Sequence, residues 1–487
     1  MATTKIGNAG VTFPDNTVQN SAANSVIYPV KFMSVNDQNT AFRHAFVILN
    51  DNSIRGWGDP GAWRLGTGDA NYRVFAESPA FPPYFPGATA VHTSNEVLGA
   101  VIDLNGQLWT WGTNDYGQNG RGDTADTTVP YNASLNVNNS IYGRTVTKIA
   151  LPCGAEDVGF IMVLCSDGTV HACGYNGYGQ CGNGNTTNQY YFVRCGTLTN
   201  VVDISCGREN YTSCTAVTSS GQLYVWGYNG DWQLGTNNGS HQSTPLLRDT
   251  GSLTGKTITK AQAGFLTIVA LASDGTLHGA GNQTTGSFGI GNTSRQNVFT
   301  QIASGVADFS NNNYDYPVTI IRKTNNTMQW AGGNGTGDQA LSTSYVVSTD
   351  EYGVPTYGYT NGTVWQPINI PTTINGAAVT PVKWVKGGTG NYNYILILMS
   401  NGYVYGCGYG GNGALANGYS SNVPASSPTL CLIPPCTDIA CWGHGAEGTT
   451  GFITTTRKLY CSGYGGGYSN ANVRGETVWS PIVVQLY

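Results

Sequence analysis

Short apolar runs alternate with polar turns along the chain, and this pattern predicts β-strands. One unit recurs eight times: an apolar strand, a two-residue polar turn, a second strand ending in an aromatic residue or cysteine followed by glycine, and a glycine-rich loop. In one copy Leu108, Thr110 and Gly112 alternate with Trp109 and Trp111, which is the period of a pleated strand. Each unit therefore predicts a β-hairpin.

The turn residues agree with this prediction. The two-residue tips are Asn105-Gly106, Asp167-Gly168, Ser220-Gly221, Asp274-Gly275 and Asn401-Gly402. Such pairs tolerate the positive φ angles of tight hairpin turns. A further predicted strand precedes each hairpin, as at Val146–Ala150, Val201–Ser205, Ile258–Ala261, Val382–Val385 and Thr437–Ala440.

The glycine that ends the second strand sets the repeat length. These glycines are Gly58, Gly112, Gly174, Gly227, Gly281, Gly332, Gly408 and Gly463, with spacings of 54, 62, 53, 54, 51, 76 and 55 residues. Units of three or four strands cannot bury both faces alone and must stack on one another. A ring of four-stranded blades achieves this with few free edges. The pattern predicts an all-β chain with a single β-propeller over residues 25–487.

Three copies resemble the repeat of the regulator of chromosome condensation family: Ala100–Thr124, Val163–Thr186 and Ala216–Asn238. The resemblance extends from about Ile27 to Tyr487 and implies a β-propeller, usually of seven blades. Eight copies here leave two alternatives, namely eight blades, or seven with one copy in another role. Trp63 and Trp232 stand where other copies have glycine, and copies six and eight are degenerate.

Residues 1–24 differ from the repeats. The stretch Gly10–Ala23 resembles a short phrase of bacteriophage tail-fibre and related virion proteins. This resemblance implies a segment for attachment or oligomerisation, whose candidate contact residues are Val11, Phe13, Pro14 and Val18. The structural alternative is an extra strand that closes the ring.

Composition excludes several classes. Aromatic residues make up 11% of the chain, enough to build a core, so disorder is excluded. The net charge of −5 provides no basic footprint for nucleic acid. The longest aliphatic run, Tyr394–Met399, is too short to cross a membrane. The start lacks a basic-then-apolar signal peptide, so the twelve cysteines predict thiols and not a disulfide framework.

Two constellations could carry chemistry. The spacing Cys431-x4-Cys436-x4-Cys441-x2-His444 could form a zinc site, although the repeat explains Cys441 as a small buried residue at a strand end. We expect no metal, no cofactor and no catalytic residues. The 76-residue interval holds Tyr345, Tyr352, Tyr357, Tyr359 and Trp365, which are candidate receptor-binding residues. The alternative for that interval is a fourth strand with a long hairpin packed on the neighbouring blade.

These observations lead to a hypothesis about function. We expect a bacteriophage virion protein, a tail-fibre or tail-associated component that displays a propeller for adhesion to the host surface or attachment within the particle. Its partners would be other tail proteins and a host surface glycan or protein, in an oligomer or multi-copy assembly made in the host cytoplasm. The alternative is a non-viral propeller binding module, either a protein inhibitor or a relative of GTPase exchange factors.

Overall fold

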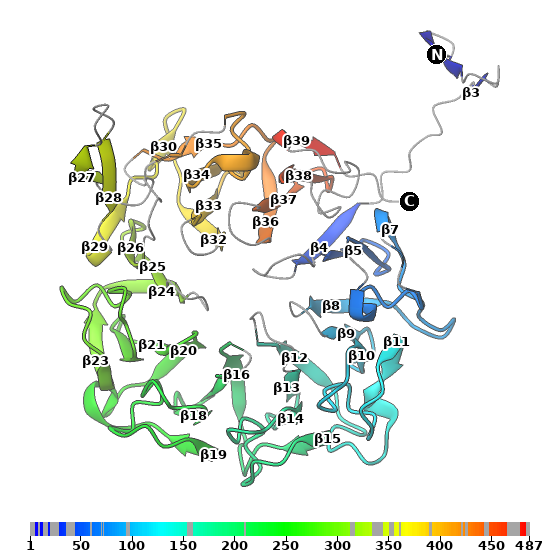
Figure 1. The fold of residues 1–487 in the computed structure, drawn as a ribbon, viewed down its shortest axis with the longest axis vertical. Helices are drawn as coiled ribbons and strands as arrows, with labels where there is room; N and C mark the ends of the chain where they lie inside the picture. The colour runs from blue at the N-terminus through cyan, green and yellow to red at the C-terminus, as the bar shows by residue number, and fades with distance from the viewer. Residues whose placement is uncertain are drawn as a thin grey trace.

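Eight four-stranded antiparallel sheets stand around a central axis in the computed structural model (Figure 1). The structure describes residues 5–7, 10–12, 18–19 and 29–483, except 36–43, 59–60, 70, 72, 94–97, 153–158, 209–210, 312–316, 334–343, 350–354, 360–361, 389–391, 420–421, 424–426, 443–447 and 465–477. All eight repeats form blades, including the degenerate sixth and eighth. The chain is therefore an eight-bladed β-propeller, which confirms the all-β prediction and decides the blade number.

Each blade is one contiguous stretch of chain, and its first strand lies nearest the axis (Figure 1). Blades 1 to 4 are β4–β7 (Val30–Val35, His44–Leu49, Ile54–Gly58, Arg73–Glu77), β8–β11 (Ala88–Thr93, Leu98–Asp103, Leu108–Gly112, Thr127–Asn132), β12–β15 (Val146–Ala150, Phe160–Cys165, Val170–Gly174, Gln189–Arg194) and β16–β19 (Val201–Cys206, Ser213–Thr218, Leu223–Gly227, Gln242–Leu247). Blades 5 to 8 are β20–β23 (Ile258–Ala263, Thr267–Ala272, Leu277–Gly281, Gln296–Ala303), β24–β26 with β29 (Val306–Asn311, Val318–Lys323, Met328–Gly332, Gly362–Ile368), β32–β35 (Pro381–Gly387, Tyr394–Met399, Val404–Gly408, Thr429–Leu430) and β36–β39 (Cys436–Trp442, Thr449–Thr454, Leu459–Gly463, Val478–Val483).

A few elements lie outside the blades. Two hairpins are inserted, β27–β28 (Ser344–Thr349, Pro355–Tyr359) and β30–β31 (Thr373–Ile374, Ala377–Ala378), and four 3-10 turns, η1–η4, occupy Gly61–Trp63, Ala133–Leu135, Gly251–Leu253 and Gly411–Gly413. Within the described ranges, no helix is long and apolar enough to cross a membrane.

The N-terminal strands do not complete a blade. Strands β1 (Lys5–Gly7), β2 (Gly10–Thr12) and β3 (Val18–Gln19) pair with one another in a separate three-stranded sheet. The alternative of a ring-closing strand is therefore wrong for these described strands. Val11 lies on β2 and Val18 on β3, whereas Phe13 and Pro14 lie outside the described residues.

A recurring backbone hydrogen bond joins seven of the eight blades to the preceding blade. The first strand begins with an N–H that donates to a carbonyl at the hairpin tip of the preceding blade, as from Ile258 to Gly221 at 2.8 Å. Val30 donates in the same way to Arg457 at 2.9 Å, so blade 1 meets blade 8 through the bond used elsewhere in the ring. The equivalent position in blade 7 is Pro381, which has no N–H to donate.

In several repeats the residue before the strand-ending glycine forms a second link between blades. Trp111 donates from Nε1 to the Arg64 carbonyl at 2.7 Å, and Trp226 donates to the Gln180 carbonyl at 2.8 Å. Cys173, at the same position in blade 3, approaches the Gln118 carbonyl with its Sγ at 3.3 Å. Where this residue is tryptophan or cysteine, its side chain can donate into the preceding blade, whereas Ala280 and Ala331 at this position in blades 5 and 6 provide no donor.

Two tryptophans adopt a conformation that other repeats give to glycine. Trp63 has a φ of 62° and Trp232 a φ of 65°, whereas Gly117, Gly179 and Gly286 occupy the matching loop positions with φ of 82°, 78° and 79°. The left-handed region is accessible to glycine without steric cost and disfavoured for other residues. The two departures from the repeat are thus substitutions within an unchanged loop.

All eleven described cysteines are free and buried, which agrees with the prediction of thiols; Cys153 lies outside the described residues. Burial raises the pKa of the Cys165 thiol to about 11 and that of Cys407 to about 12. Burial, followed by the Asp438 carboxylate, raises the pKa of Cys436 to about 12. These side chains pack as neutral apolar groups.

The inner wall of the ring alternates lysine and aspartate. The third residue of each first strand is Lys148, Asp203, Lys260, Asp308, Lys383 and Asp438 in blades 3 to 8. Neighbours pair across blade junctions: Lys148 with Asp203, Lys260 with Asp308 at 2.7 Å, and Lys383 with Asp438. From blade 3 to blade 8, the residue type at this position therefore repeats every two blades. Blades 1 and 2 have Phe32 and Ala90 at this position.

Candidate interaction surface

Seven rings form a continuous aromatic surface where the loops between strands 1 and 2 meet those between strands 3 and 4. This aromatic loop surface consists of Tyr116, Tyr175, Tyr178, Tyr211, Tyr228, His241 and Phe265. Successive ring centroids lie between 4.7 and 6.5 Å apart, from blade 2 to blade 5. Tyr211 and His241 are exposed, and the other five rings are half-buried. The surface is therefore a connected set of rings that remains accessible from one face.

Buried asparagines shape the loops between strands 3 and 4, which carry five of the seven rings. Asn229 accepts the Leu234 N–H at 2.9 Å and donates to the Asn238 and Ser240 carbonyls at 2.8 and 3.0 Å. Asn114 and Asn176 make the corresponding bonds in blades 2 and 3 and are also fully buried. Because each amide closes its loop from within, the rings start from a fixed backbone.

Two of the tyrosines, Tyr175 and Tyr228, enter these loops directly after a strand-ending glycine. Gly174 and Gly227 have φ of 102° and 91°, and the next residues, Tyr175 and Tyr228, donate their N–H groups back to Gly159 and Thr212 at 2.8 and 3.0 Å. The positive φ turns the chain sharply out of the sheet. A Gly-Tyr step at the end of the third strand therefore places a tyrosine on this face.

The surface is polar without carrying much charge. Burial, followed by the Asp231 carboxylate, raises the pKa of Tyr228, whose Oη donates to Asp231 at 3.3 Å. Burial also raises the pKa of Tyr175, so both phenols remain neutral donors near pH 7. Two guanidinium groups lie beside aromatic rings: Arg208 is 4.6 Å from the Phe265 ring and Arg295 is 4.5 Å from the Trp232 ring.

The residues singled out from sequence occupy a different place. Tyr345, Tyr357 and Tyr359 belong to the β27–β28 hairpin inserted before the fourth strand of blade 6, and Tyr352 lies outside the described residues. Trp365, on β29, donates from Nε1 to the Ile302 carbonyl of blade 5 at 3.0 Å. Trp365 thus packs on the neighbouring blade, as the alternative interpretation of this interval predicts.

The cysteine-histidine constellation is only partly described. Cys431, Cys436 and Cys441 are buried, and His444 lies outside the described residues. Across the described part of the chain, no group of three or more histidine, cysteine, aspartate or glutamate side chains is placed to hold a metal ion.

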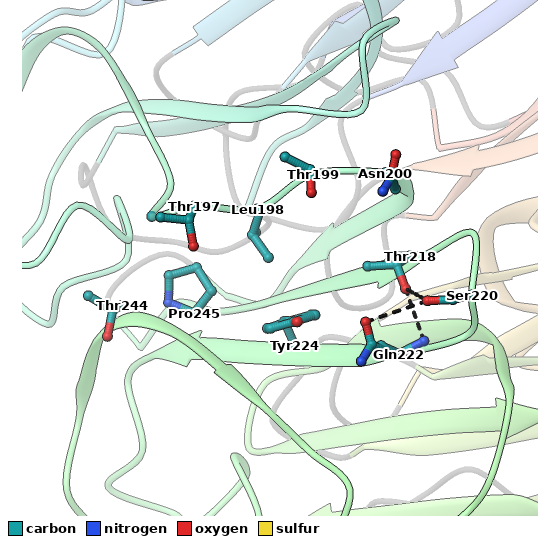
Figure 2. A pocket seen from close by; sticks show the side chains of 11 residues that line it. Thr197, Leu198, Thr199, Asn200, Thr218, Ser220, Gln222, Tyr224, Thr244 and Pro245 are labelled. Atoms are coloured by element: carbon teal, nitrogen blue, oxygen red, sulfur yellow. Dashed lines mark hydrogen bonds between the residues drawn. The ribbon is translucent and has the colours of Figure 1, made fainter.

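A cavity of about 290 Å³ opens on the opposite face, between blades 3 and 4. Figure 2 shows Leu198, Tyr224 and Pro245 around one part of it and the hairpin residues Thr218 and Gln222 around another. The Thr218 hydroxyl accepts the Gln222 N–H at 3.0 Å, so the hairpin satisfies its own polar groups. None of the described lining residues carries a carboxylate, imidazole, amine or thiol.

A chain of four side chains runs through blade 3. The Thr169 hydroxyl donates to Asp167 at 2.6 Å, so its oxygen accepts from His171 Nε2 at 2.8 Å. Nδ1 of the neutral ring then accepts the Ser140 hydroxyl at 2.7 Å. Blade 5 repeats this arrangement with Ser252, His278, Thr276 and Asp274. The recurrence in two blades indicates a structural role. The buried histidine links the hairpin by hydrogen bonds to the chain segment that precedes the blade.

Comparisons with known proteins agree with the fold. Residues 105–155, 167–212 and 220–271 match the model of the regulator of chromosome condensation (RCC1) repeat. The chain is 27% identical to the E3 ubiquitin-protein ligase HERC2 of Homo sapiens over 258 residues, which are 52% of this chain and 5% of that protein. It is 33% identical to the probable E3 ubiquitin-protein ligase HERC4 of Homo sapiens over 150 residues, 30% of this chain and 13% of that protein.

Among solved structures, the crystal structure of human WBSCR16 superposes with a TM-score of 0.57 at 18% identity, covering 82% of this chain and 98% of that one. This similarity concerns the fold alone. The chain is thus an eight-bladed propeller that carries RCC1 repeats, and it spans only a small part of the two ligases. All seven rings of the aromatic loop surface lie within the three matched stretches.

Proposed function

We propose that this chain is a binding propeller and that its aromatic loop surface holds a partner protein. The observation that carries the proposal is the connected set of seven rings across four blades. Tyrosine, tryptophan and arginine dominate the binding energy of protein interfaces. A suitable partner would present apolar side chains to the rings, with carbonyl or carboxylate oxygens to accept from the tyrosine hydroxyls and from Arg208.

The loop architecture supports this proposal. Buried asparagines fix the backbone of the loops between strands 3 and 4, so the five rings on these loops lose little conformational entropy on binding, which favours affinity. The resemblance to RCC1 repeats supports the same class of function, the binding module. Activity of the ligase type belongs to the named relatives and is not proposed for this chain.

Site-specific photo-cross-linking tests the proposal. With p-benzoylphenylalanine at Tyr211, we expect one discrete adduct in a lysate of the source cells. The same group at Tyr142, an exposed tyrosine on the opposite face, should give none. With the purified adduct partner, Tyr211→Ala should raise Kd at least tenfold, about 1.4 kcal/mol, and Tyr142→Ala less than twofold. Equal adducts from both positions, or none from Tyr211, would contradict the proposal.

A second candidate is attachment to a virion through residues 1–24. The separate pairing of β1–β3 supports it, because this sheet adds nothing to the ring. The resemblance of Gly10–Ala23 to tail-fibre phrases is the other support. If it is right, deleting residues 1–24 should leave the melting temperature of the propeller nearly unchanged while abolishing incorporation into particles or oligomers, measured by sedimentation. A deletion that unfolds the ring, or leaves assembly intact, would contradict it.

A further inference from the structure

Trp232 has a strained backbone in the loop between β18 and β19, which also carries Tyr228 and His241. Its φ of 65° lies in the left-handed region, which is unfavourable for any residue with a Cβ. The Trp232 N–H donates to the Asn229 carbonyl at 2.9 Å, and its carbonyl accepts from Gly235 at 3.0 Å. Glycine forms the same turn in blades 2, 3 and 5, so the loop itself does not require this ring. Backbone strain of this kind is concentrated at functional sites.

The tryptophan side chain emerges at the junction between blades 4 and 5. At the matching Gly117, Gly179 and Gly286, an added Cβ would lie 2.6, 2.4 and 2.7 Å from a Cα atom in the fourth strand of the following blade. In blade 4 the following fourth strand is β23, and Arg295 directly precedes it. The guanidinium carbon of Arg295 lies 4.5 Å from the centre of the Trp232 ring. The ring therefore meets an arginine of the next blade.

Arg295 is an exposed guanidinium that is held by two neighbours. The Trp232 ring covers one face of it, and its Nε donates to Asn297 Oδ1 at 3.2 Å. Within the described residues no carboxylate pairs with it, and its terminal N–H groups have no acceptor there. A planar guanidinium that stacks on a ring can bind a carboxylate through two parallel N–H bonds. Stacking also lowers the side-chain entropy that is lost on binding.

This pair adjoins the aromatic loop surface. Asp231, directly before Trp232, accepts from the Tyr228 Oη at 3.3 Å and from Asn282 Nδ2 at 3.0 Å. Neutral donors thus occupy the Asp231 carboxylate, which leaves the charge of Arg295 for a ligand. The Asp231 charge and the net charge of −5 disfavour a polyanion such as nucleic acid, whereas a single carboxylate suits one guanidinium.

We propose that Trp232 and Arg295 together bind an acidic side chain of the partner protein, an aspartate or a glutamate. The inference rests on the proposed function and specifies the partner, which presents a carboxylate beside the apolar side chains that meet the seven rings. Arg295 makes the contact, and Trp232 is a positioning residue that holds the guanidinium. The strained backbone is retained because a glycine could not hold Arg295.

Binding of the partner purified through its Tyr211 adduct tests the proposal with the full chain. Arg295→Gln should raise Kd at least tenfold, and Trp232→Gly should raise it at least threefold although the charge remains. Arg121→Gln is the matched control, because Arg121 lies on the same face beside a tyrosine ring but is already paired with Asp123 at 3.1 Å. It should change Kd less than twofold.

Two further readouts distinguish positioning from a general loss of structure. Added salt, from about 50 to about 300 mM NaCl, should raise the Kd of the unaltered chain more steeply than that of Arg295→Gln. The double variant of Trp232→Gly with Arg295→Gln should raise Kd less than the product of the two single effects, because both changes remove one contact. Trp232→Phe keeps a ring under the guanidinium and should restore most of the affinity.

Thermal unfolding tests whether Trp232 serves the fold instead. Trp232→Gly should not lower the melting temperature, because glycine adopts the left-handed backbone without strain. Trp63→Gly is the matched control, since Trp63 has the same loop position and a φ of 62° but lies in blade 1, outside the blades that carry the seven rings. It should likewise keep the melting temperature, and it should leave Kd unchanged.

The proposal is wrong if Arg295→Gln or Trp232→Gly changes Kd no more than Arg121→Gln does. It is also wrong if Trp232→Gly lowers the melting temperature by more than about 5 °C, since Trp232 would then hold the blades together. In either case Tyr211→Ala still weakens binding if the proposed function is right, so that function stands. If Tyr211 captures no partner, the proposed function and this inference fail together.

Discussion

Trp226→Ala should lower the free energy of unfolding by about 3–5 kcal/mol, the range for removing a large aromatic side chain from a packed core. Trp226 is fully buried and packs with residues of blades 3 and 4. Its Nε1 also donates to the Gln180 carbonyl across the junction, and alanine would leave that acceptor without this donor. Urea denaturation followed by far-UV circular dichroism measures the loss.

Trp226→Phe separates the two contributions to this loss. Phenylalanine keeps much of the ring volume but cannot donate, so we expect a loss of about 1–2 kcal/mol from the missing hydrogen bond and the reduced volume. A surface change such as Tyr419→Ala should stay within about 0.5 kcal/mol. If Trp226→Ala changed stability no more than Tyr419→Ala, the link between blades would not contribute as described.

Stability should fall as the pH falls from about 6.5 toward 4. Burial, followed by the charges of Arg144 and Arg194, lowers the pKa of His171 to about 3. Burial, followed by the charge of Lys256, lowers the pKa of His278 to about 4. The unfolded chain binds protons at both sites near pH 6.5 while the folded chain does not, so acid favours unfolding. Between pH 7.5 and 5.0 we expect a loss of about 2 kcal/mol per histidine.

The double variant His171→Gln with His278→Gln is the control. Glutamine can still donate and accept but does not titrate, so the loss between pH 7.5 and 5.0 should shrink by most of about 4 kcal/mol. Carboxylates with lowered pKa, such as Asp51, act in the same direction but only near and below their usual value of about 3.8. An equal loss in the double variant would show that other groups cause the acid sensitivity.

Much of the fold could be predicted from the sequence because its signals are local. Strand alternation and Asn-Gly or Asp-Gly tips depend on neighbouring residues, and they locate the hairpins correctly. The number of blades could not be predicted, since a degenerate copy such as Arg457 and its neighbours has no Gly tip yet closes the eighth hairpin through left-handed Arg457. Whether such a copy forms a blade depends on packing against its neighbours, which a single repeat does not contain.

The candidate surface was harder to predict for a physical reason. The 76-residue interval, which is rich in tyrosine, predicts a binding surface, although Trp365 there packs on the adjacent blade. The aromatic loop surface is assembled from one to three rings per repeat, and the repeats are separated by about fifty residues. The local sequence signal was the Gly-Tyr step at Gly174-Tyr175 and Gly227-Tyr228. This step predicts a tyrosine in a loop, but the contact between rings of neighbouring blades depends on how the blades pack.

Because every blade is one uninterrupted stretch, the ring can be assembled vectorially during translation. Each blade can form its four strands before the next one leaves the ribosome, and it finds its binding surface on the blade already made. Only the junction between blades 8 and 1, which includes the Val30–Arg457 hydrogen bond, must wait, because its two sides are separated by almost the whole coding sequence. Until that junction forms, the nascent chain is an open arc whose two end blades each expose an apolar face that the closed ring buries.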